Sequence, residues 1–597
     1  MIEFGVKYCF VNLGSDHPSI VESIVKGQNE KKSSFPQIIT SPNEMVALSM
    51  ADGYARFTGK PQCVIVHVDV GTQGLGAAVH NASCGRAPVL IFAGLSPYTC
   101  EGELRGSRTE YIHWIQDVPD QKQIVGQYCR YTGEIKRGVN VKQMVGRALQ
   151  FALSAPMGPV YLVGSREAME EEIPEYKLKV EQWGPVGVGA LPEIGVQMIA
   201  EALADAKEPL LITGYSGRNH AAVGQLVQLT ETVKGLRVLD TGGSDMCFPS
   251  NHRASIGLRY GVEDSIKSAD VILVIDCDVP WIPTQCKPKD DTKIFHIDAD
   301  PLKQQMPVFY LHAEARYKAD CYTSVKQLHE FISANKDLKQ KVETYADRWG
   351  KLQQLHDKRM NIIHDLARPG KGNDYNASYL CAAIRKAVPE DTVFAIEAVT
   401  STGFVADQIL PCIPGTWINC GGGGLGWSGG GALGIKLAAG EKRFVCQIVG
   451  DGTFLFSVPG SAYWISQRYK LPVLTVILNN QGQRTIPTLS SPSLLPISSG
   501  WNAPKRSLLL VHPDGAGSRA TNEELNISFA PSPDYAGIAK AAAGGNLWAE
   551  HATTVDELHD LLPKAIESVK NGIGAVLDAH LDGPQGKYGG GKSVLVG

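Results

Sequence analysis

Short apolar runs alternate with longer amphipathic segments along most of the chain. Most of these runs are apolar throughout, which is typical of parallel strands that helices cover on both faces. The segments between them, such as 192–206 and 556–570, have helical patterns. The alternation predicts an α/β fold built from doubly wound parallel sheets. The clearest predicted strands are 7–13, 62–68, 88–93, 160–163, 209–213, 271–276, 293–297, 392–396, 444–449 and 472–478.

Two polar stretches interrupt this pattern, and we expect both to be linkers. Segment 170–192 is charged and then rich in Gly and Pro, and segment 335–376 is strongly charged. They divide the chain into three units of ordinary domain size, predicted at 1–175, 190–335 and 370–585. Within the last unit the pattern breaks down over 489–533 into Ser, Pro, Gly and Asn, which predicts an irregular excursion that serves as a lid or binding loop.

Composition and charge exclude several classes of protein. With 597 residues, 43 % of them hydrophobic and 20 % charged, the chain can bury several cores and is not disordered. A net charge of −4 gives no basic field for a nucleic acid partner. No apolar run is long enough for a membrane span, and the start does not resemble a secretory signal. Thirteen Cys without a CxxC pair indicate neither a disulfide framework nor a zinc site, so we expect a cytoplasmic protein.

Glycine is over-represented, with 63 residues in 597, against a usual share of about 7 %. Such an excess indicates tight turns, close packing, or backbone that approaches a ligand. Eight of the eleven residues in 421–431 are Gly. We expect this run to lie where the backbone approaches a bound cofactor.

The strongest chemical signal is Gly450-Asp451-Gly452-Thr453, directly after the predicted strand 444–449. The next predicted strand is followed by Asn479-Asn480-Gln481-Gly482. A Gly-Asp-Gly turn lets backbone approach a diphosphate, and Asp and Asn oxygens with a backbone carbonyl suit Mg²⁺ or Ca²⁺. Neighbouring parallel strands end at one edge, which brings these groups together. The alternative is a plain turn without a ligand.

This arrangement resembles the cofactor motif of thiamine-diphosphate-dependent enzymes. The resemblance implies that Asp451, Asn480 and the carbonyl of Gly482 hold Mg²⁺ on the cofactor diphosphate. It also implies that Leu425 wedges between the two rings of the cofactor and that the carbonyl of Gly423 accepts a hydrogen bond from its 4′-amino group. Further expected cofactor contacts are Thr400, Ser401, Gly452 and Thr453.

A second match lies near the start of the chain. Pro42-Asn43-Glu44-Met45, followed by Ala51-Asp52-Gly53-Tyr54-Ala55-Arg56, resembles the segment that carries the activating glutamate of this family. The resemblance implies that Glu44 binds the aminopyrimidine ring of the cofactor and promotes loss of the proton from its reactive carbon. The alternative is an ordinary carboxylate at a helix start.

Together these matches resemble the group of acetolactate synthase, benzoylformate decarboxylase and pyruvate decarboxylase. That group has pyrimidine-binding, central and diphosphate-binding domains in this order. The resemblance implies a C–C lyase or carboligase that decarboxylates a 2-keto acid and protonates the enamine or adds it to a second carbonyl, such as an aldehyde. It also implies a dimer or tetramer with the active site between subunits.

Three alternatives stay open. The first is a transferase like acetolactate synthase but without flavin; no FAD is expected, because 277–285 lacks the arginine of the flavin contact. The second is a non-catalytic member of the family. The third, a nicotinamide-dependent dehydrogenase, lacks a GxGxxG turn after the first strand of any unit.

The substrate side is less defined, and its expected catalytic residues are Ser15, His67, His113 and Gln116. Ser15 lies in a turn that resembles one in benzoylformate decarboxylase, and His67 aligns with a pocket histidine of that enzyme. The adjacent His pair and the late Glu of pyruvate decarboxylases are replaced by His113-Trp114 and Ile486. Because we expect Ile486, Trp114 and Trp281 near the site, we expect a bulky or aromatic acyl group.

Overall fold

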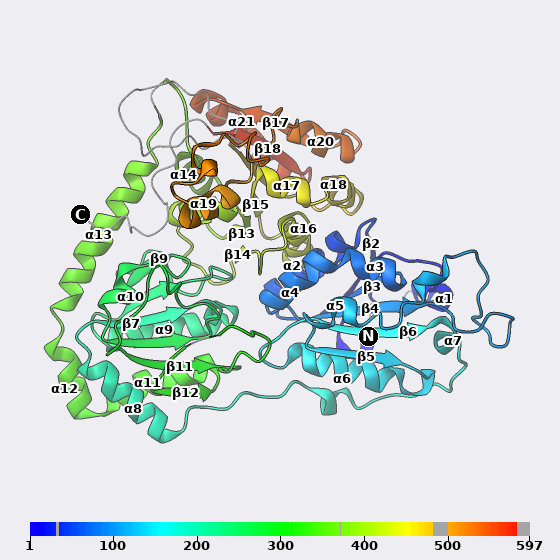
Figure 1. Ribbon diagram of the computed structural model, residues 1–597, viewed down its shortest axis with the longest axis horizontal. Helices are drawn as coiled ribbons and strands as arrows, with labels where there is room; N and C mark the ends of the chain where they lie inside the picture. Colours follow the sequence, from blue (N-terminus) through cyan, green and yellow to red (C-terminus); the bar gives the residue numbers. More distant parts are fainter. Residues whose placement is uncertain (31–34, 310, 371, 481–499, 582–597) are drawn as a thin grey trace.

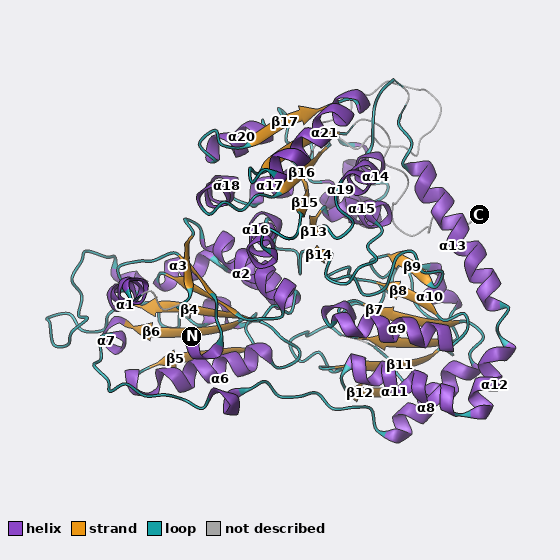
Figure 2. Cartoon of the chain, turned by 180° about the vertical axis from the view of Figure 1, so that it is seen from behind, coloured by secondary structure: helices purple, strands orange, loops and turns teal. Residues whose placement is uncertain are grey.

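The structure is a computed structural model that describes residues 1–30, 35–309, 311–370, 372–480 and 500–581. Three α/β units follow one another along the chain, and helices cover both faces of each sheet (Figures 1 and 2). Within the described residues each unit has a six-stranded sheet whose paired strands all run parallel. The predicted fold class is confirmed.

The first unit has the strand order β2-β1-β3-β4-β6-β5. Its strands are β1 (Tyr8–Val11), β2 (Gln37–Thr40), β3 (Gln62–Val66), β4 (Val89–Leu95), β5 (Tyr131–Ile135) and β6 (Val160–Ser165). Its helices are α1 (Pro18–Asn29), α2 (Glu44–Thr58), α3 (Val68–Gly74), α4 (Gly76–Cys84), α5 (Gln123–Gly126), α6 (Val141–Leu153) and α7 (Arg166–Met169).

The central unit has the order β12-β11-β10-β7-β8-β9. Its strands are β7 (Pro209–Thr213), β8 (Arg237–Asp240), β9 (Ser255–Leu258), β10 (Val271–Ile275), β11 (Lys293–Asp298) and β12 (Ala315–Lys318). Its helices are α8 (Glu193–Asp205), α9 (His220–Thr232), α10 (Asp264–Ser268) and α11 (Cys321–Ala334).

The last unit has the order β14-β13-β15-β16-β18-β17. Its strands are β13 (Val393–Glu397), β14 (Trp417–Asn419), β15 (Val445–Gly450), β16 (Leu474–Asn479), β17 (Trp548–Ala552) and β18 (Ala575–His580). Its helices are α14 (Ala377–Ala387), α15 (Thr402–Ile409), α16 (Trp427–Ala439), α17 (Asp451–Phe456), α18 (Pro459–Arg468), α19 (Asn502–Val511), α20 (Tyr535–Ala542) and α21 (Val555–Lys570).

The two predicted linkers differ in structure. Segment 170–192 contains only the 3-10 turn Val180–Trp183 and runs as a long connection between units (Figure 1). The prediction of a linker over 335–376 is wrong for most of its length, because α12 (Lys336–Thr344) and α13 (Arg348–Leu366) occupy it. Most of their charged residues face water while Leu338, Val342 and Leu352 are buried, so each is an amphipathic helix. Arg348 and Arg359 of α13 are charged and also buried.

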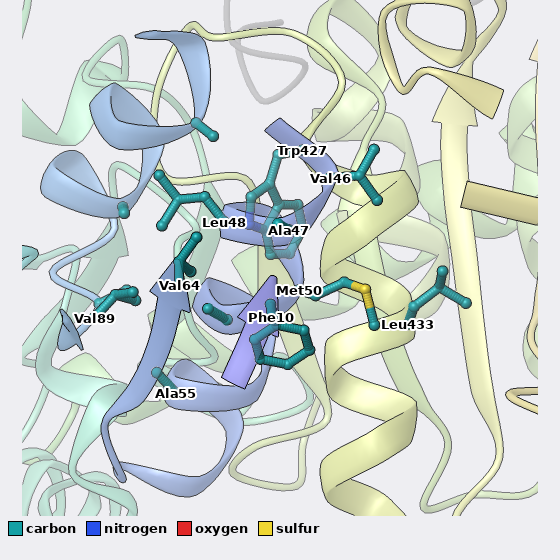
Figure 3. Packing of buried hydrophobic residues seen from close by; sticks show 14 of the residues in the cluster. Phe10, Val46, Ala47, Leu48, Met50, Ala55, Val64, Val89, Trp427 and Leu433 are labelled. Carbon is teal, nitrogen blue, oxygen red and sulfur yellow. The ribbon is translucent and has the colours of Figure 1, made fainter. Parts of the chain in front are cut away.

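Helices α2 and α16 cross at unusually close range and join the first unit to the last. All eleven residues from Val46 to Arg56 are buried. In Figure 3, Met50 of α2 points at α16 near Leu433. A Cβ added at Gly434 would lie 2.0 Å from the carbonyl oxygen of Met50, so only glycine lets the two backbones meet here.

This crossing gives the last three glycines of the run 421–431 a different role from the expected one. Gly429, Gly430 and Gly431 lie inside α16, not in a loop. A Cβ at Gly430 would lie 2.7 Å from the carbonyl oxygen of Val46, and one at Gly53 would lie 2.2 Å from that of Gly431. These glycines serve helix packing.

In the part of the chain that the structure describes, no helix is both long and apolar enough to span a membrane.

Candidate active site

Asp451 and Asn480 meet at the carboxyl edge of the last sheet. Gly450 is paired with Leu478 across β15 and β16, so the residues that follow the two strands are neighbours. Asp451 is 5 % exposed, and its Oδ1 accepts a hydrogen bond from the N–H of Gly452 at 2.7 Å. Burial raises the pKa of Asp451 to about 6, against the opposing effect of N–H groups of Gly452 and Asn480.

The second carboxylate oxygen of Asp451 fits a bound cation. Oδ2 is buried and has no hydrogen-bond partner among the described residues. Burying a carboxylate oxygen that accepts no hydrogen bond costs free energy unless a cation or a proton binds to it. Asp451 and Asn480 therefore fit the expected Mg²⁺ site. The expected third ligand, Gly482, lies outside the described residues, as does Ile486.

The described part of the predicted excursion, 500–533, covers this turn. A Cβ at Gly452 would lie 2.6 Å from the ring of Phe529 and 3.2 Å from Nε1 of Trp501. The rings of Trp501 and Phe529 meet edge to face, with centroids 5.1 Å apart. The segment is not wholly irregular, since it contains α19. Thr453 lies beneath it in the first turn of α17 and is buried.

Thr400 and Ser401 form a second turn at the same edge of the sheet. They belong to a 3-10 turn directly after β13, in which Val399 has φ of +46°. The carbonyl of Thr400 accepts a hydrogen bond at 3.5 Å from the guanidinium of Arg506 in α19. The excursion therefore brings a cation to the turn that we expect to contact the diphosphate.

Gly423 and Leu425 lie in the loop before α16, which is fixed on both sides. The carboxylate of Glu397, at the end of β13, accepts hydrogen bonds from the N–H groups of Gly426, Trp427 and Ser428 at 2.9, 3.2 and 2.7 Å. Burial raises the pKa of Glu397 to about 7, although these donors oppose it. Sequence reasoning missed Glu397; the only signal was an acidic residue ending an apolar strand.

The other side of this loop is held by the first unit. The N–H of Gly423 donates to Nε2 of His80 at 3.2 Å, and the N–H of Gly424 donates to Oδ1 of Asn81 at 3.1 Å. Both partners belong to α4. Leu425 therefore follows a segment fixed to the first unit and precedes a helix start fixed by Glu397.

Glu44 is the first residue of α2, and Asn43 caps this helix by accepting the N–H of Val46 at 3.2 Å. The carboxylate lies against α3. A Cβ at Gly74 would lie 2.8 Å from Oε2 of Glu44, and one at Gly71 would lie 3.6 Å from Oε1. The two glycines leave room for the carboxylate, which is half-buried.

His67 is paired with Asp16, a residue that sequence reasoning did not select. His67 follows β3, and its Nδ1 lies 2.5 Å from Oδ1 of Asp16. The other oxygen of Asp16 accepts the N–H of Val68 at 3.2 Å. The hydrogen bond to Asp16 raises the pKa of His67. Nδ1 of His17 lies 3.1 Å from the same Oδ1 of Asp16, and burial lowers the pKa of His17.

Ser15 is fixed by a second charged pair. The guanidinium of Arg166 donates to the carbonyl of Ser15 at 3.0 Å and to the carboxylate of Glu110 at 3.1 Å. Burial would raise the pKa of Glu110, but hydrogen bonds from Thr109, Ser15 and Arg166 bring it down to about 2. The structure thus brings the turn of Ser15 and Asp16 to His67.

The remaining expected pocket residues lie in an exposed loop. Nδ1 of His113 accepts the N–H of Ile115 at 3.2 Å and caps the 3-10 turn Trp114–Gln116. The side chain of Trp114 is 77 % exposed and Gln116 is half-buried. Among the described residues no hydrogen bond or ring contact joins His113 to His67, so within one chain His113 has a capping role.

Comparisons with known proteins agree with this geometry. Models described as thiamine pyrophosphate enzyme N-terminal TPP binding, central and C-terminal TPP binding domains match residues 1–124, 196–327 and 398–578. The large subunit of acetolactate synthase isozyme 3 from Escherichia coli (strain K12) is 24 % identical over 575 residues, 92 % of this chain and 88 % of that protein.

Two further proteins extend the likeness. The 2-hydroxyacyl-CoA lyase 2 of Bos taurus is 22 % identical over 497 residues, 77 % of this chain and 75 % of that protein. A solved thiamine diphosphate-dependent 4-hydroxybenzoylformate decarboxylase from Rhodococcus jostii RHA1 superposes with a TM-score of 0.73 at 19 % identity, covering 97 % of each chain. The resemblance inferred from the sequence is confirmed.

Proposed function

The chain belongs to the thiamine pyrophosphate enzyme family, and we propose that it decarboxylates a 2-keto acid with thiamine diphosphate and Mg²⁺. The carbonyl carbon of the substrate then takes up a proton to give an aldehyde, or attacks a second carbonyl to give an acyloin. The observation that carries this proposal is that one chain holds both a glutamate at the start of α2 and Asp451 and Asn480 at adjacent strand ends.

Each site residue has a distinct part in this proposal. When bound, the cofactor supplies a nucleophilic carbon that accepts the electrons of the broken C–C bond. Glu44 would hold a proton at the aminopyrimidine ring, and its position against Gly71 and Gly74 fixes that carboxylate. Asp451 and Asn480 would hold Mg²⁺ at the diphosphate, and Leu425 would pack beneath the cofactor rings.

His67 would handle the proton at the substrate. Its Nδ1 is occupied by Asp16, which leaves Nε2 as the ring nitrogen for the pocket. A carboxylate partner stabilises the imidazolium form and fixes the ring orientation. His67 is thus able to donate a proton to the substrate carbonyl or its carbon. Ser15, in the same turn as Asp16, supplies a hydroxyl nearby.

Product analysis tests the reaction. The full chain with thiamine diphosphate and Mg²⁺ is given a panel of aliphatic and aromatic 2-keto acids, with and without aldehydes, and the products are identified by mass spectrometry. We expect CO₂ together with an aldehyde or acyloin. We also expect a preference for substrates with a bulky or aromatic acyl group, and Trp114 is the described residue that would line the pocket for this group. Absence of CO₂ from every substrate contradicts the proposal.

Glu44→Gln separates an enzyme from a non-catalytic relative. Loss of the proton-handling carboxyl should lower kcat by about 10²- to 10⁴-fold, while the affinity for thiamine diphosphate, measured by fluorescence quenching, stays within a few-fold. Unchanged turnover in this variant contradicts the assignment of Glu44. The non-catalytic alternative predicts no turnover in either protein.

An acetolactate-synthase-like transferase is the second candidate, favoured by the Escherichia coli relative. Pyruvate alone would then give acetolactate as the main product. We propose that FAD takes no part, and the contacts of Arg86 support this. At the edge of the central sheet near β7 and β10, where a dinucleotide would bind, Arg86 stacks on Tyr215 at 4.1 Å and contacts Asp278 at 2.8 Å.

We further propose a dimer or tetramer with the site between subunits. Tyr111, Trp114 and Ile115 are exposed together in the loop of His113, which supports contact with a partner subunit. Light scattering of the active protein tests this, and an active monomer contradicts it.

All thirteen cysteines are free thiols, which supports a cytoplasmic location.

A further inference from the structure

A second cluster of potential metal ligands lies on the sheet of the last unit, at whose edge Asp451 also lies. His551 in β17 and Asp578 in β18 are direct partners in the pairing of these strands. His580 follows Asp578 by two residues, and residues two apart in a strand lie on one face. One donor atom of each side chain lies within 4.8 Å of the others. The strand register therefore brings two imidazoles and a carboxylate to one point.

The distances suit a four-coordinate metal ion. Oδ2 of Asp578 lies 3.0 Å from Nδ1 of His551 and 3.3 Å from Nε2 of His580. Ligands at about 2.0–2.2 Å from a tetrahedral Zn²⁺ are about 3.3–3.6 Å apart. An ion can therefore enter between these atoms with little movement of the side chains.

The outer polar atoms of all three side chains already have partners. Nε2 of His551 lies 3.2 Å from a carboxylate oxygen of Asp534. Nδ1 of His580 lies 3.4 Å from the hydroxyl of Thr553, and Oδ1 of Asp578 accepts the amide of Asn479 at 2.9 Å. Such outer partners orient metal ligands and fix the tautomer of histidines.

The two carboxylates around His551 also suit a bound cation. His551 faces a carboxylate oxygen with each of its ring nitrogens, Asp578 on one side and Asp534 on the other. A neutral imidazole carries a proton on only one nitrogen, so the lone pair of the other would face an anionic oxygen. A metal ion between Nδ1 and Asp578 removes this repulsion and leaves Nε2–H to donate to Asp534.

We propose that His551, Asp578 and His580 bind a transition-metal dication of the Zn²⁺ type, in a site separate from that of Asp451 and Asn480. Imidazole ligands favour such ions, whereas the oxygen ligands of the Asp451 site favour Mg²⁺. The side chain of His551 is 42 % exposed, which leaves a path for the ion and a position for water. The bound ion would join the ends of β17 and β18.

Metal titration of the full chain tests this inference. The protein is stripped with a chelator, saturated with Mg²⁺ and thiamine diphosphate, and titrated with Zn²⁺ by calorimetry and with Co²⁺ by visible absorption. We expect one equivalent per chain. His551→Gln and His580→Gln should each lose more affinity than the about 10- to 100-fold that follows loss of an outer partner.

Asp534→Asn and His559→Gln sharpen the test. Asp534 also caps α20 by accepting the N–H of Gly537 at 2.7 Å, and Asn keeps that cap. We expect Asp534→Asn to fold and to bind Zn²⁺ about 10-fold more weakly. His559, an exposed histidine on α21, contacts Tyr379 instead, so His559→Gln should bind like the wild type.

Three results would overturn the inference. Binding that is absent, or equal in wild type and His551→Gln, excludes the site. A thiolate charge-transfer band with Co²⁺ assigns the ion to cysteines. Loss of binding in Asp451→Asn, with retention in His551→Gln, assigns it to the other site.

Discussion

At the scale of single residues, the chemistry of the candidate site depends on partners that are distant in sequence. Asp16 and His67 are separated by fifty-one positions, yet a 2.5 Å contact joins them. Glu397 holds three N–H groups at the start of α16. Asp451 and Asn480 could be predicted, because each directly follows an apolar strand. Asp16 and Glu397 could not, because only tertiary packing brings their partners to them.

Asp16→Asn should lower the pKa of His67. The carboxylate stabilises the imidazolium, so its loss favours the neutral ring, and an opposite charge at this range shifts a pKa by about 1–3 units. In an NMR titration we expect the midpoint of the His67 imidazole signals to occur at lower pH in the variant than in the wild type. In the pH profile of kcat, the limb that requires protonated His67 should also move to lower pH.

Two observations decide the meaning of that result. A pH profile that moves while the free energy of unfolding stays nearly unchanged supports proton transfer by His67. An unchanged titration of His67 contradicts the pair, whatever the effect on activity.

At the scale of elements, the strongest constraint is the crossing of α2 and α16. The segment Ala51–Arg56 resembles a family signature, and the structure gives a physical reason for two of its residue types. Gly53 admits the backbone of α16, and Arg56 donates to the carbonyls of Asn419 and Ser244 at 2.6 Å, in the other two units. The same short segment therefore packs a helix and ties the three units together.

Gly434→Ala should destabilise the protein strongly. The added Cβ would lie 2.0 Å from the carbonyl oxygen of Met50, and neither backbone can withdraw without opening the core. Overpacking of this kind costs about 1–3 kcal/mol, occasionally more. Urea unfolding measures the change in the free energy of unfolding.

Gly224→Ala is the matched control. Gly224 lies inside α9, and a Cβ there would meet no atom within 4 Å. Alanine is the better helix former by about 1 kcal/mol, so this variant should be slightly more stable. Equal effects of the two substitutions would show that the crossing tolerates a side chain.

Most long apolar strands could be predicted, whereas several short edge strands could not. β12 and β17 carry polar residues, because one side of an edge strand is open to water. Helices α12 and α13 were mistaken for a linker for a related reason. Their charged residues dominate the composition, and the few buried apolar positions become clear only when neighbouring helices are in place.

At the scale of the whole molecule, buried ion pairs join the first and central units. Arg86, in the loop before β4, contacts Asp278 at 2.8 Å and Asp298 at 3.5 Å. Lys303 reaches the same two carboxylates, at 2.8 and 2.5 Å. The two cations and two anions balance, so loss of one partner would leave buried charge uncompensated.

Arg86→Met should therefore cost about 3–5 kcal/mol in the free energy of unfolding. We also expect calorimetric unfolding to broaden or divide relative to the wild type, because the two units lose a buried charged contact. The control is Arg137→Met, which removes an exposed pair with Glu171 and should change the free energy of unfolding far less. Similar costs for the two variants would contradict the importance of the buried network.

The helix crossing also limits how this protein can change its substrate. Glu44 begins one of the two helices and the loop of Leu425 leads into the other, so a contact with no space for even one methyl group fixes how each chain presents these two residues to the sites that it would share with a partner subunit. Variation in acyl size must therefore arise in the segments around the cofactor, at Ser15, near Trp114 and over 500–533. A library directed at those loops would explore specificity, whereas one directed at the crossing would mostly yield unfolded chains.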